Sequence, residues 1–251
     1  IFVISKDSDI RNHGDGLASY YDVLMSHAFG NYRDLIEEIA YHPSMGIYLS
    51  HFRNQKTDLD ENIFPDENFA RELMQLFSIG LFQLKQNGEL KTDINGDAIP
   101  TYDAEDVRNL AKVFTGLGAG AVTEEGLNEG HTLSFATSVG MLDYTEPMVM
   151  YDEYHEQGKK TILGSKIIPD GQSGDEDIQM ALDYIFNHPN VGPFISHRLI
   201  QQLIKSNPSP AYVRDVALVF NNNGEGVRGD LKAVIKEILL HEEARECIWL
   251  E

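Results

Sequence analysis

NYRDLIEEIAYHPSMGIYLSH, residues 31 to 51, contains the pattern from which the fold of this chain can be worked out. Apolar residues recur three and four positions apart up to position 41, which predicts an amphipathic helix that begins after Asn31, a residue type preferred at helix N-caps. Pro43 disfavours helix at the residue before it and suits the first turn of a helix, so His42 ends one helix and can cap the next. The stretch therefore predicts two helices joined by a His-Pro corner.

The corner occurs twice in the sequence. HPNVGPFISH, residues 188 to 197, repeats HPSMGIYLSH, residues 42 to 51, in the pattern His-Pro-x-x-Gly-x-x-x-Ser-His. A weaker third copy, VIKEILLHEEAR, has Glu instead of Pro after His241. In the two full copies, apolar residues fall on one side of the second helix at spacings of three and four, which is the pattern of a buried face. We expect both full copies to be helix-corner-helix units with superposable backbones.

Two explanations of the repeated histidines remain open. His42 and His51 are nine residues apart, roughly 13 Å along a helix at the standard rise, so one copy cannot hold a metal ion with both. A metal site would need histidines from different copies together with carboxylates. The favoured alternative is architectural: the histidines end and cap helices, while Gly46 and Ser50 let a neighbouring helix approach closely.

Helical spacing continues over most of the chain, and residues 81–102 are the main exception. This segment places two turn signals, Asn87-Gly88 and Asn95-Gly96, between short alternating runs, which predicts a small β-hairpin. The predicted fold is mainly α: a multi-helix bundle with repeated helix-corner-helix units and a small β-hairpin insertion. The expected helices cover residues 17–30, 31–42, 66–80, 103–116, 175–188, 189–206, 209–223 and 229–245.

The chain can be divided into three stretches. Residues 1–116 form an N-terminal helical part that carries the hairpin at 81–102, and residues 175–251 form a C-terminal helical part. Between them, residues 117–174 have no sustained period and many glycines, which predicts an irregular insertion with one short strand in KKTILG. We expect the three stretches to fold as one compact unit.

The overall charge limits the classes of partner. Forty acidic and twenty basic residues give a net charge of −20, which repels phosphate backbones and anionic membrane surfaces, so no nucleic-acid partner is expected. No apolar run is long enough to cross a bilayer, and we expect no membrane insertion in this segment.

The single cysteine, Cys247, excludes an internal disulfide. The chain begins with Ile rather than Met and lacks a signal peptide, so we expect it to be processed, trimmed or a fragment.

Two segments carry candidate catalytic residues. In DENFAREL, residues 66 to 73, Glu67 and Arg71 are four apart and can pair, while Glu72 lies about 100° away around the helix axis. These charges are explained by ion pairs that fix helix packing, or by Glu72 acting as a general base or metal ligand. In YDEYHEQGKKTILG, residues 151 to 164, His155 can act as an acid, a base or a ligand; the alternative is a solvated turn. The candidate catalytic residues are Glu72, His155, Lys159, Glu67 and Arg71.

A third segment, DINGDAIPTYD at residues 93 to 103, offers oxygen ligands of the kind that calcium accepts. Its glycine follows Asn95 directly, so the spacing is not that of an EF-hand loop, and a hairpin turn explains the segment without an ion. The chain has no P-loop, dinucleotide fingerprint, HExxH helix or GxSxG elbow, so the common nucleotide, zinc-protease and serine-hydrolase interpretations lack support and the cofactor is unknown. The weak metal-ligand candidates are Asp93, Asn95, Asp97 and Asp103.

The order of four motifs resembles a bacterial family, the domain of unknown function 1800 family. The motifs are DENFARELMQLFSIG, TYDAEDVRNLAKVFTG, HEQGKKTILG and the segment from residue 188 to 240. The blocks (N/D)-E-N-x-A-R-E-L and H-x-x-G-x-K-x-x-L-G make the match specific, and it runs through nearly the whole chain. The resemblance places the recurring polar positions at Glu67, Asn68, Arg71, Glu72, His155, Gly158, Lys159 and Gly164.

The resemblance implies a mostly helical, exported bacterial protein with no established activity. Family members are commonly longer at the N-terminus, so this chain is expected to be a fragment without that part. Many members have His where this chain has Phe77, which weakens a metal site on that helix. Family genes often neighbour those of an exported family that looks like sulfatases or phosphatases, which suggests another exported protein as a partner.

Two functions follow from these observations. The first is a binding or assembly module in the periplasm or outside the cell. The alternative is a hydrolase-type enzyme that uses a carboxylate and His155, with or without a metal ion.

Overall fold

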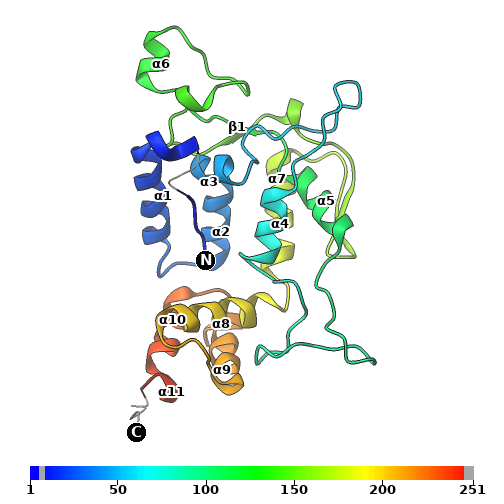
Figure 1. The fold of residues 1–251 in the computed structure, drawn as a ribbon, viewed down its shortest axis with the longest axis vertical. Helices are drawn as coiled ribbons and strands as arrows, with labels where there is room; N and C mark the ends of the chain where they lie inside the picture. The colour runs from blue at the N-terminus through cyan, green and yellow to red at the C-terminus, as the bar shows by residue number, and fades with distance from the viewer. Residues whose placement is uncertain (6–8, 246–251) are drawn as a thin grey trace.

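The computed structural model describes residues 1–5 and 9–245 (Figure 1). Helices make up most of its regular structure, and the predicted mainly α fold is confirmed. The α-helices are α1 (Gly14–Ser26), α2 (Tyr32–Tyr41), α3 (Pro43–Tyr48), α4 (Asn68–Gln75), α5 (Ala104–Val113), α6 (Glu124–Asn128), α7 (Gly174–Phe186), α8 (Val191–Leu203), α9 (Pro210–Asn221), α10 (Leu231–Leu240) and α11 (Glu242–Arg245). The 3-10 helices are η1 (Asp9–Asn12), η2 (Val139–Met141) and η3 (Asp152–Tyr154), and the strands are β1 (Leu117–Gly118), β2 (Val149–Met150), β3 (Lys160–Ile162) and β4 (Lys166–Ile168).

The helices form two neighbouring groups. Figure 1 shows α1 to α5 and α7 in its upper part and α8 to α11 gathered below them, near the C-terminus. Within the groups, α2 packs against α1 and α7, α4 against α5, and α9 against both α8 and α10. None of the helices in the described ranges is both long and apolar enough to cross a membrane.

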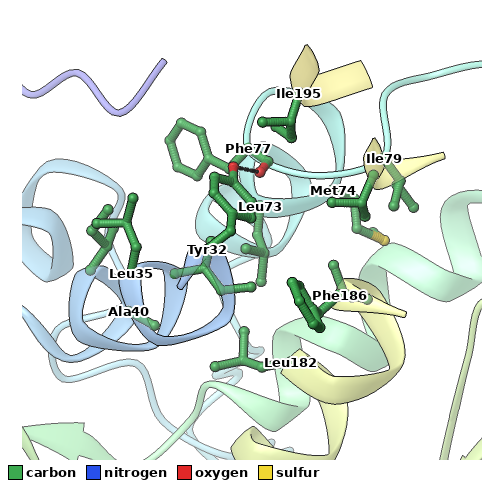
Figure 2. Packing of buried hydrophobic residues seen from close by; sticks show 14 of the residues in the cluster. Tyr32, Leu35, Ala40, Leu73, Met74, Phe77, Ile79, Leu182, Phe186 and Ile195 are labelled. Atoms are coloured by element: carbon green, nitrogen blue, oxygen red, sulfur yellow. Dashed lines mark hydrogen bonds between the residues drawn. The ribbon is translucent and has the colours of Figure 1, made fainter. Parts of the chain in front are cut away.

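One apolar core runs through both groups. Its buried cluster includes side chains from every helix from α1 to α10 except α6. Figure 2 shows Tyr32 of α2 between Leu73 and Leu182, with its hydroxyl donating a hydrogen bond to the carbonyl of Phe77. The cluster contains residues from all three predicted stretches, 1–116, 117–174 and 175–251. The division of the chain into these stretches stays a prediction.

The predicted His-Pro corner is present between α2 and α3. His42 is the C-cap of α2 and the N-cap of α3, and its Nδ1 accepts a hydrogen bond from the backbone N–H of Ser44 at 3.1 Å. A ring nitrogen that accepts a hydrogen bond carries no proton, so this cap requires the unprotonated form of Nδ1. The same bond recurs at the other two corners, from Asn190 N–H to His188 at 3.2 Å and from Glu243 N–H to His241 at 3.2 Å.

The two full copies differ after the corner. In the first copy α3 ends at Tyr48, and Ser50 takes a left-handed conformation with a φ of 65°. In the second copy the helix continues through Ser196 to Leu203. The expectation of superposable backbones is therefore wrong beyond the corner. In the first copy the chain reverses its direction after α3. A hydrogen bond within this copy holds the reversal, because His51 donates from Nε2 to the carbonyl of Ala40 at 2.9 Å.

Residues 81–102 contain the predicted small hairpin in a loose form. Instead of continuous strands, isolated antiparallel bridges hold the segment together, and its two turns have Gly88 at a φ of 79° and Gly96 at 91°. Both Asn-Gly pairs lie in turns, as predicted, and each glycine has a positive φ, which glycine adopts without strain. The insertion between residues 117 and 174 holds two antiparallel strand pairs, β1 with β2 and β3 with β4, and β3 falls within the predicted KKTILG strand.

Candidate functional site

The charges of DENFAREL lie on the outer side of α4, except for Glu72. Glu67 and Arg71 form the expected pair at 2.7 Å, with both side chains partly exposed. Glu72 is half-buried, and its Oε2 is fully buried without a hydrogen-bond partner. The hydroxyl of Tyr102, which precedes α5, is also buried without a partner. Burial raises the pKa of Tyr102; the charge of Arg71 opposes this rise, and the charge of Glu72 adds a smaller contribution in the same direction as burial.

His155 lies in a buried network rather than on a solvated turn. Its Nδ1 is 2.8 Å from the carbonyl oxygen of Thr115, at the end of α5, so Nδ1 carries a proton and donates. Its Nε2 is 3.1 Å from Oδ2 of Asp177 in the first turn of α7. Lys160, the first residue of β3, donates to the same carboxylate oxygen at 2.6 Å. The network thus ties the loop after β2 to two helices.

The carboxylate of Asp177 is the centre of this network. Burial alone would raise the pKa of Asp177, but hydrogen bonds from His155, Lys160 and Gln172 outweigh burial and lower it. The side chains of His155, Asp177 and Lys160 are each at most 2% exposed. A buried ionised pair with further hydrogen bonds is an arrangement that fixes a structure, and it leaves no surface for a substrate.

The structure does not bring the two predicted catalytic segments together. In the part of the chain that it describes, no hydrogen bond or ion pair joins His155 to Glu67, Arg71 or Glu72. Lys159 is exposed, whereas its neighbour Lys160 is buried. The five candidates are therefore distributed over four separate places: a surface ion pair, a half-buried carboxylate, a buried network and an exposed lysine.

Two of the four weak metal-ligand candidates, Asp93 and Asp103, have side chains with structural roles. Asp93 accepts hydrogen bonds from the backbone N–H groups of Asn95 and Asp97 at 2.8 and 3.0 Å, and these bonds lower the pKa of Asp93. Asp103 caps α5 in a capping box with Asp106. No three His, Cys, Asp or Glu side chains within residues 1–5 and 9–245 are grouped so that they could hold a metal ion.

A pocket of about 550 Å³ lies at the His42 corner, between α1, α2, the start of α7 and residues 145–148. Val23, Pro147 and Met148 give it an apolar wall. Its remaining lining residues are polar or acidic, and they include no Lys or Arg among the residues described: Ser19, Glu37, Glu38, Tyr41, His42, Thr145, Glu146, Asp175 and Gln179.

Some of the pocket's carboxylates are already paired. Glu37 accepts hydrogen bonds from Arg33 at 2.7 Å and from Gln179 at 2.6 Å. Tyr41 donates to Oδ1 of Asp175 at 2.6 Å, and burial followed by this bond raises the pKa of Tyr41, so its hydroxyl stays protonated. The second oxygen of Asp175 and the exposed carboxylate of Glu146 remain to receive a ligand.

Ser19 and His42 approach each other in the pocket, but their orientation does not make them a nucleophile and its base. Because Nδ1 of His42 accepts the N–H of Ser44, the proton of the neutral ring is on Nε2, which donates to the Ser19 hydroxyl at 3.3 Å. Burial lowers the pKa of His42 to about 4. A serine nucleophile needs the opposite arrangement, in which the ring accepts the hydroxyl proton and a carboxylate orients the other nitrogen.

The comparison with protein families gives one result. The family model described as protein of unknown function (DUF1800) matches residues 1–248 of this chain. The chain belongs to the DUF1800 family. No curated protein and no solved structure matches it. Membership confirms the resemblance that the motifs gave, and it assigns no activity, so function has to be argued from the geometry of the chain.

The DUF1800 motifs contain signals that sequence reasoning missed. Counted from His155, the block H-x-x-G-x-K places its lysine at position 160, yet Lys159 was selected as the candidate. Asp177 gave no separate signal, because acidic residues are common in the first turn of any helix. In this DUF1800 chain, hydrogen bonds of His155 and Lys160 from this block hold the 151–164 loop against α5 and α7.

Proposed function

We propose that this chain is a binding module whose pocket at the His42 corner receives a cationic group on an apolar stem, such as a Lys or Arg side chain of a protein partner. The observation that carries the proposal is the composition of the pocket, with an apolar wall at Val23, Pro147 and Met148 and a carboxylate rim to which no described Lys or Arg contributes. The net charge of −20 supports a basic partner, because it attracts cations over the screening length.

The dimensions of the pocket agree with such a ligand. A volume of about 550 Å³ lies within the range of sites that bind small ligands or single side chains. Lys and Arg bury their aliphatic stems on apolar surface while their charged ends stay polar, so the stem would lie on Met148 and the charge near Asp175 and Glu146. Charge-assisted hydrogen bonds to these carboxylates supply the orientation.

The hydrolase alternative receives less support from the same geometry. His155 is fully buried, and it does not line the pocket at the His42 corner. Ser19 and His42 are near each other, but the ring donates to the hydroxyl instead of accepting from it. A binding role does not require Ser19 or His42 to take part in proton transfer.

We further propose that the partner is another exported bacterial protein and that binding takes place in the periplasm or outside the cell. Support comes only from the family resemblance. Cell fractionation of the source bacterium with an antibody against this chain tests the location, and recovery in the cytoplasmic fraction would contradict it.

Calorimetric titration tests the binding role. The probes are a short uncharged peptide with one central lysine and the same peptide with norleucine, which keeps the stem and removes the charge. We expect the lysine peptide to bind, with an affinity that falls as salt is added. The double variant Asp175→Asn, Glu146→Gln should weaken binding about tenfold, since each exposed charge contact contributes on the order of 0.5–1 kcal/mol.

A matched control removes two carboxylates elsewhere. Glu124 and Glu125 lie in the first turn of α6, and their change to Gln alters the net charge by the same amount. This control should retain most of the affinity. Equal weakening by both double variants, or equal binding of the norleucine peptide, would show that the pocket does not recognise the cation.

A further inference from the structure

The two Asn-Gly pairs of the 81–102 segment have the same sequence but different surroundings. Each glycine has a positive φ and donates its N–H to a turn carbonyl, Gly88 to Lys85 at 3.0 Å and Gly96 to Asp93 at 3.1 Å. The backbone therefore does not distinguish the pairs. The difference lies in how the asparagine side chains are held.

The amide of Asn87 is held at both ends. Its Oδ1 accepts from the backbone N–H of Glu89 at 3.3 Å, and its Nδ2 donates to the Glu89 carboxylate at 3.0 Å. Gly88 is half-buried, and a Cβ at this position would lie 2.9 Å from Val213 of α9. Rotation of the Asn87 amide towards the Gly88 nitrogen would break two hydrogen bonds in a crowded turn.

The amide of Asn95 is almost unrestrained. Its side chain has a single long contact, from Nδ2 to Oδ2 of Asp93 at 3.4 Å. Asn95 and Gly96 are both exposed, and nothing lies within 4 Å of the position that a Cβ of Gly96 would occupy. The amide carbon can therefore approach the glycine nitrogen without displacing another part of the protein.

We propose that Asn95 is a site of spontaneous deamidation in the folded protein. The backbone nitrogen of Gly96 loses its proton to hydroxide and attacks Cγ of Asn95, so that an N–Cγ bond forms. The Cγ–Nδ2 bond breaks, and ammonia leaves with a proton taken from water. Water then opens the cyclic imide at either carbonyl, which gives aspartate or isoaspartate, and the net reaction consumes one water and releases one ammonia.

The product changes the end of the hairpin. A new carboxylate appears between Asp93 and Asp97, whose charges already share this turn. Isoaspartate also adds a methylene to the backbone inside the turn closed by the bond from Asp93 N–H to the Asp97 carbonyl at 2.8 Å. Like-charge repulsion and the longer backbone both loosen this turn. The backbone N–H of Leu84 donates to Oδ1 of Asn190, the N-cap of α8, at 3.0 Å and keeps the base of the segment in place.

Peptide mapping by mass spectrometry after incubation in mildly alkaline buffer tests the proposal. Isoaspartate is measured in parallel by enzymatic methylation with a labelled methyl donor. We expect the conversion of Asn95 to be at least about tenfold faster than that of Asn87, because two side-chain hydrogen bonds restrain Asn87. Asn95→Gln should remove the methyl acceptance of the peptide that contains residue 95, and Asn87→Gln should leave the methyl acceptance of that peptide unchanged.

The unfolded chain provides the decisive control. In concentrated urea both pairs lose their surroundings, so their rates should become similar. If Asn87 reacts as fast as Asn95 in the folded protein, or if the preference for Asn95 is unchanged in urea, the folded environment does not select the site and the proposal is wrong.

Discussion

Replacement of His42 by Asn separates two properties that the ring combines at the first corner. The ring is 5% exposed, its Nδ1 caps α3, and burial lowers its pKa to about 4. An asparagine can also accept the N–H of Ser44, because Asn is among the preferred N-cap residues, but it does not titrate. His42→Asn should therefore keep the cap and remove the pH dependence that comes from the ring.

The expected magnitude follows from the two pKa values. In the unfolded chain this histidine has its ordinary pKa of 6.5, whereas in the folded chain its pKa is lowered to about 4. Between these values the unfolded state holds more protons, so the free energy of unfolding falls as the pH falls. For His42 alone, the loss between about pH 8 and about pH 5 is on the order of 2 kcal/mol.

Urea unfolding at the two pH values measures this loss. The wild-type protein should lose about 2 kcal/mol more than His42→Asn, since the contributions of other groups are common to both proteins. His42→Ala should be destabilised at both pH values, because it also removes the cap, which contributes about 1 kcal/mol. His131 is exposed, so His131→Asn should reproduce the wild-type loss. Equal pH dependence of wild type and His42→Asn would refute a ring held neutral by burial.

Two further predictions concern the other titratable groups. Asp177→Asn leaves the Lys160 ammonium buried without its counter-charge and should cost about 3–5 kcal/mol in urea unfolding, while Lys159→Met should change stability by less than about 0.5 kcal/mol; similar effects of both changes would contradict the assignment of Lys160. Glu72→Met removes a buried oxygen that has no hydrogen-bond partner and should raise the melting temperature, whereas a lower melting temperature would mean that Glu72 has a stabilising partner.

The corners could be predicted because proline acts locally. Pro43 disfavours helix at the preceding residue, so the end of α2 and the start of α3 follow from two letters at the first corner. At the second corner α8 begins only at Val191, two residues after Pro189. How long the following helix continues does not follow in this way. Ser50 and Ser196 occupy the same place in the pattern, yet one is left-handed and the other lies within α8. Tertiary contacts decide between these outcomes.

The candidate site was harder to predict than the fold. The pocket draws its lining from residues 19–42, 145–148 and 175–179, which only the packing of α2 against α1 and α7 brings together. No local motif marks such a site. The density of charged residues marks the 151–164 segment in the sequence, but this density does not tell whether the histidine among them is buried or exposed. Lys160 and Asp177 are each surrounded by other polar residues in the sequence. Only their burial in the folded chain shows that they form an internal ion pair.

Nuclear magnetic resonance of the chain during titration with the lysine peptide tests the central claim most directly, because it reports where the cation binds. We expect shift changes concentrated at the His42 corner, on Ser19, Tyr41 and Asp175, and their loss in the Asp175→Asn, Glu146→Gln variant. Shift changes spread evenly over the acidic surface, or centred on the α4 ion pair, would contradict it.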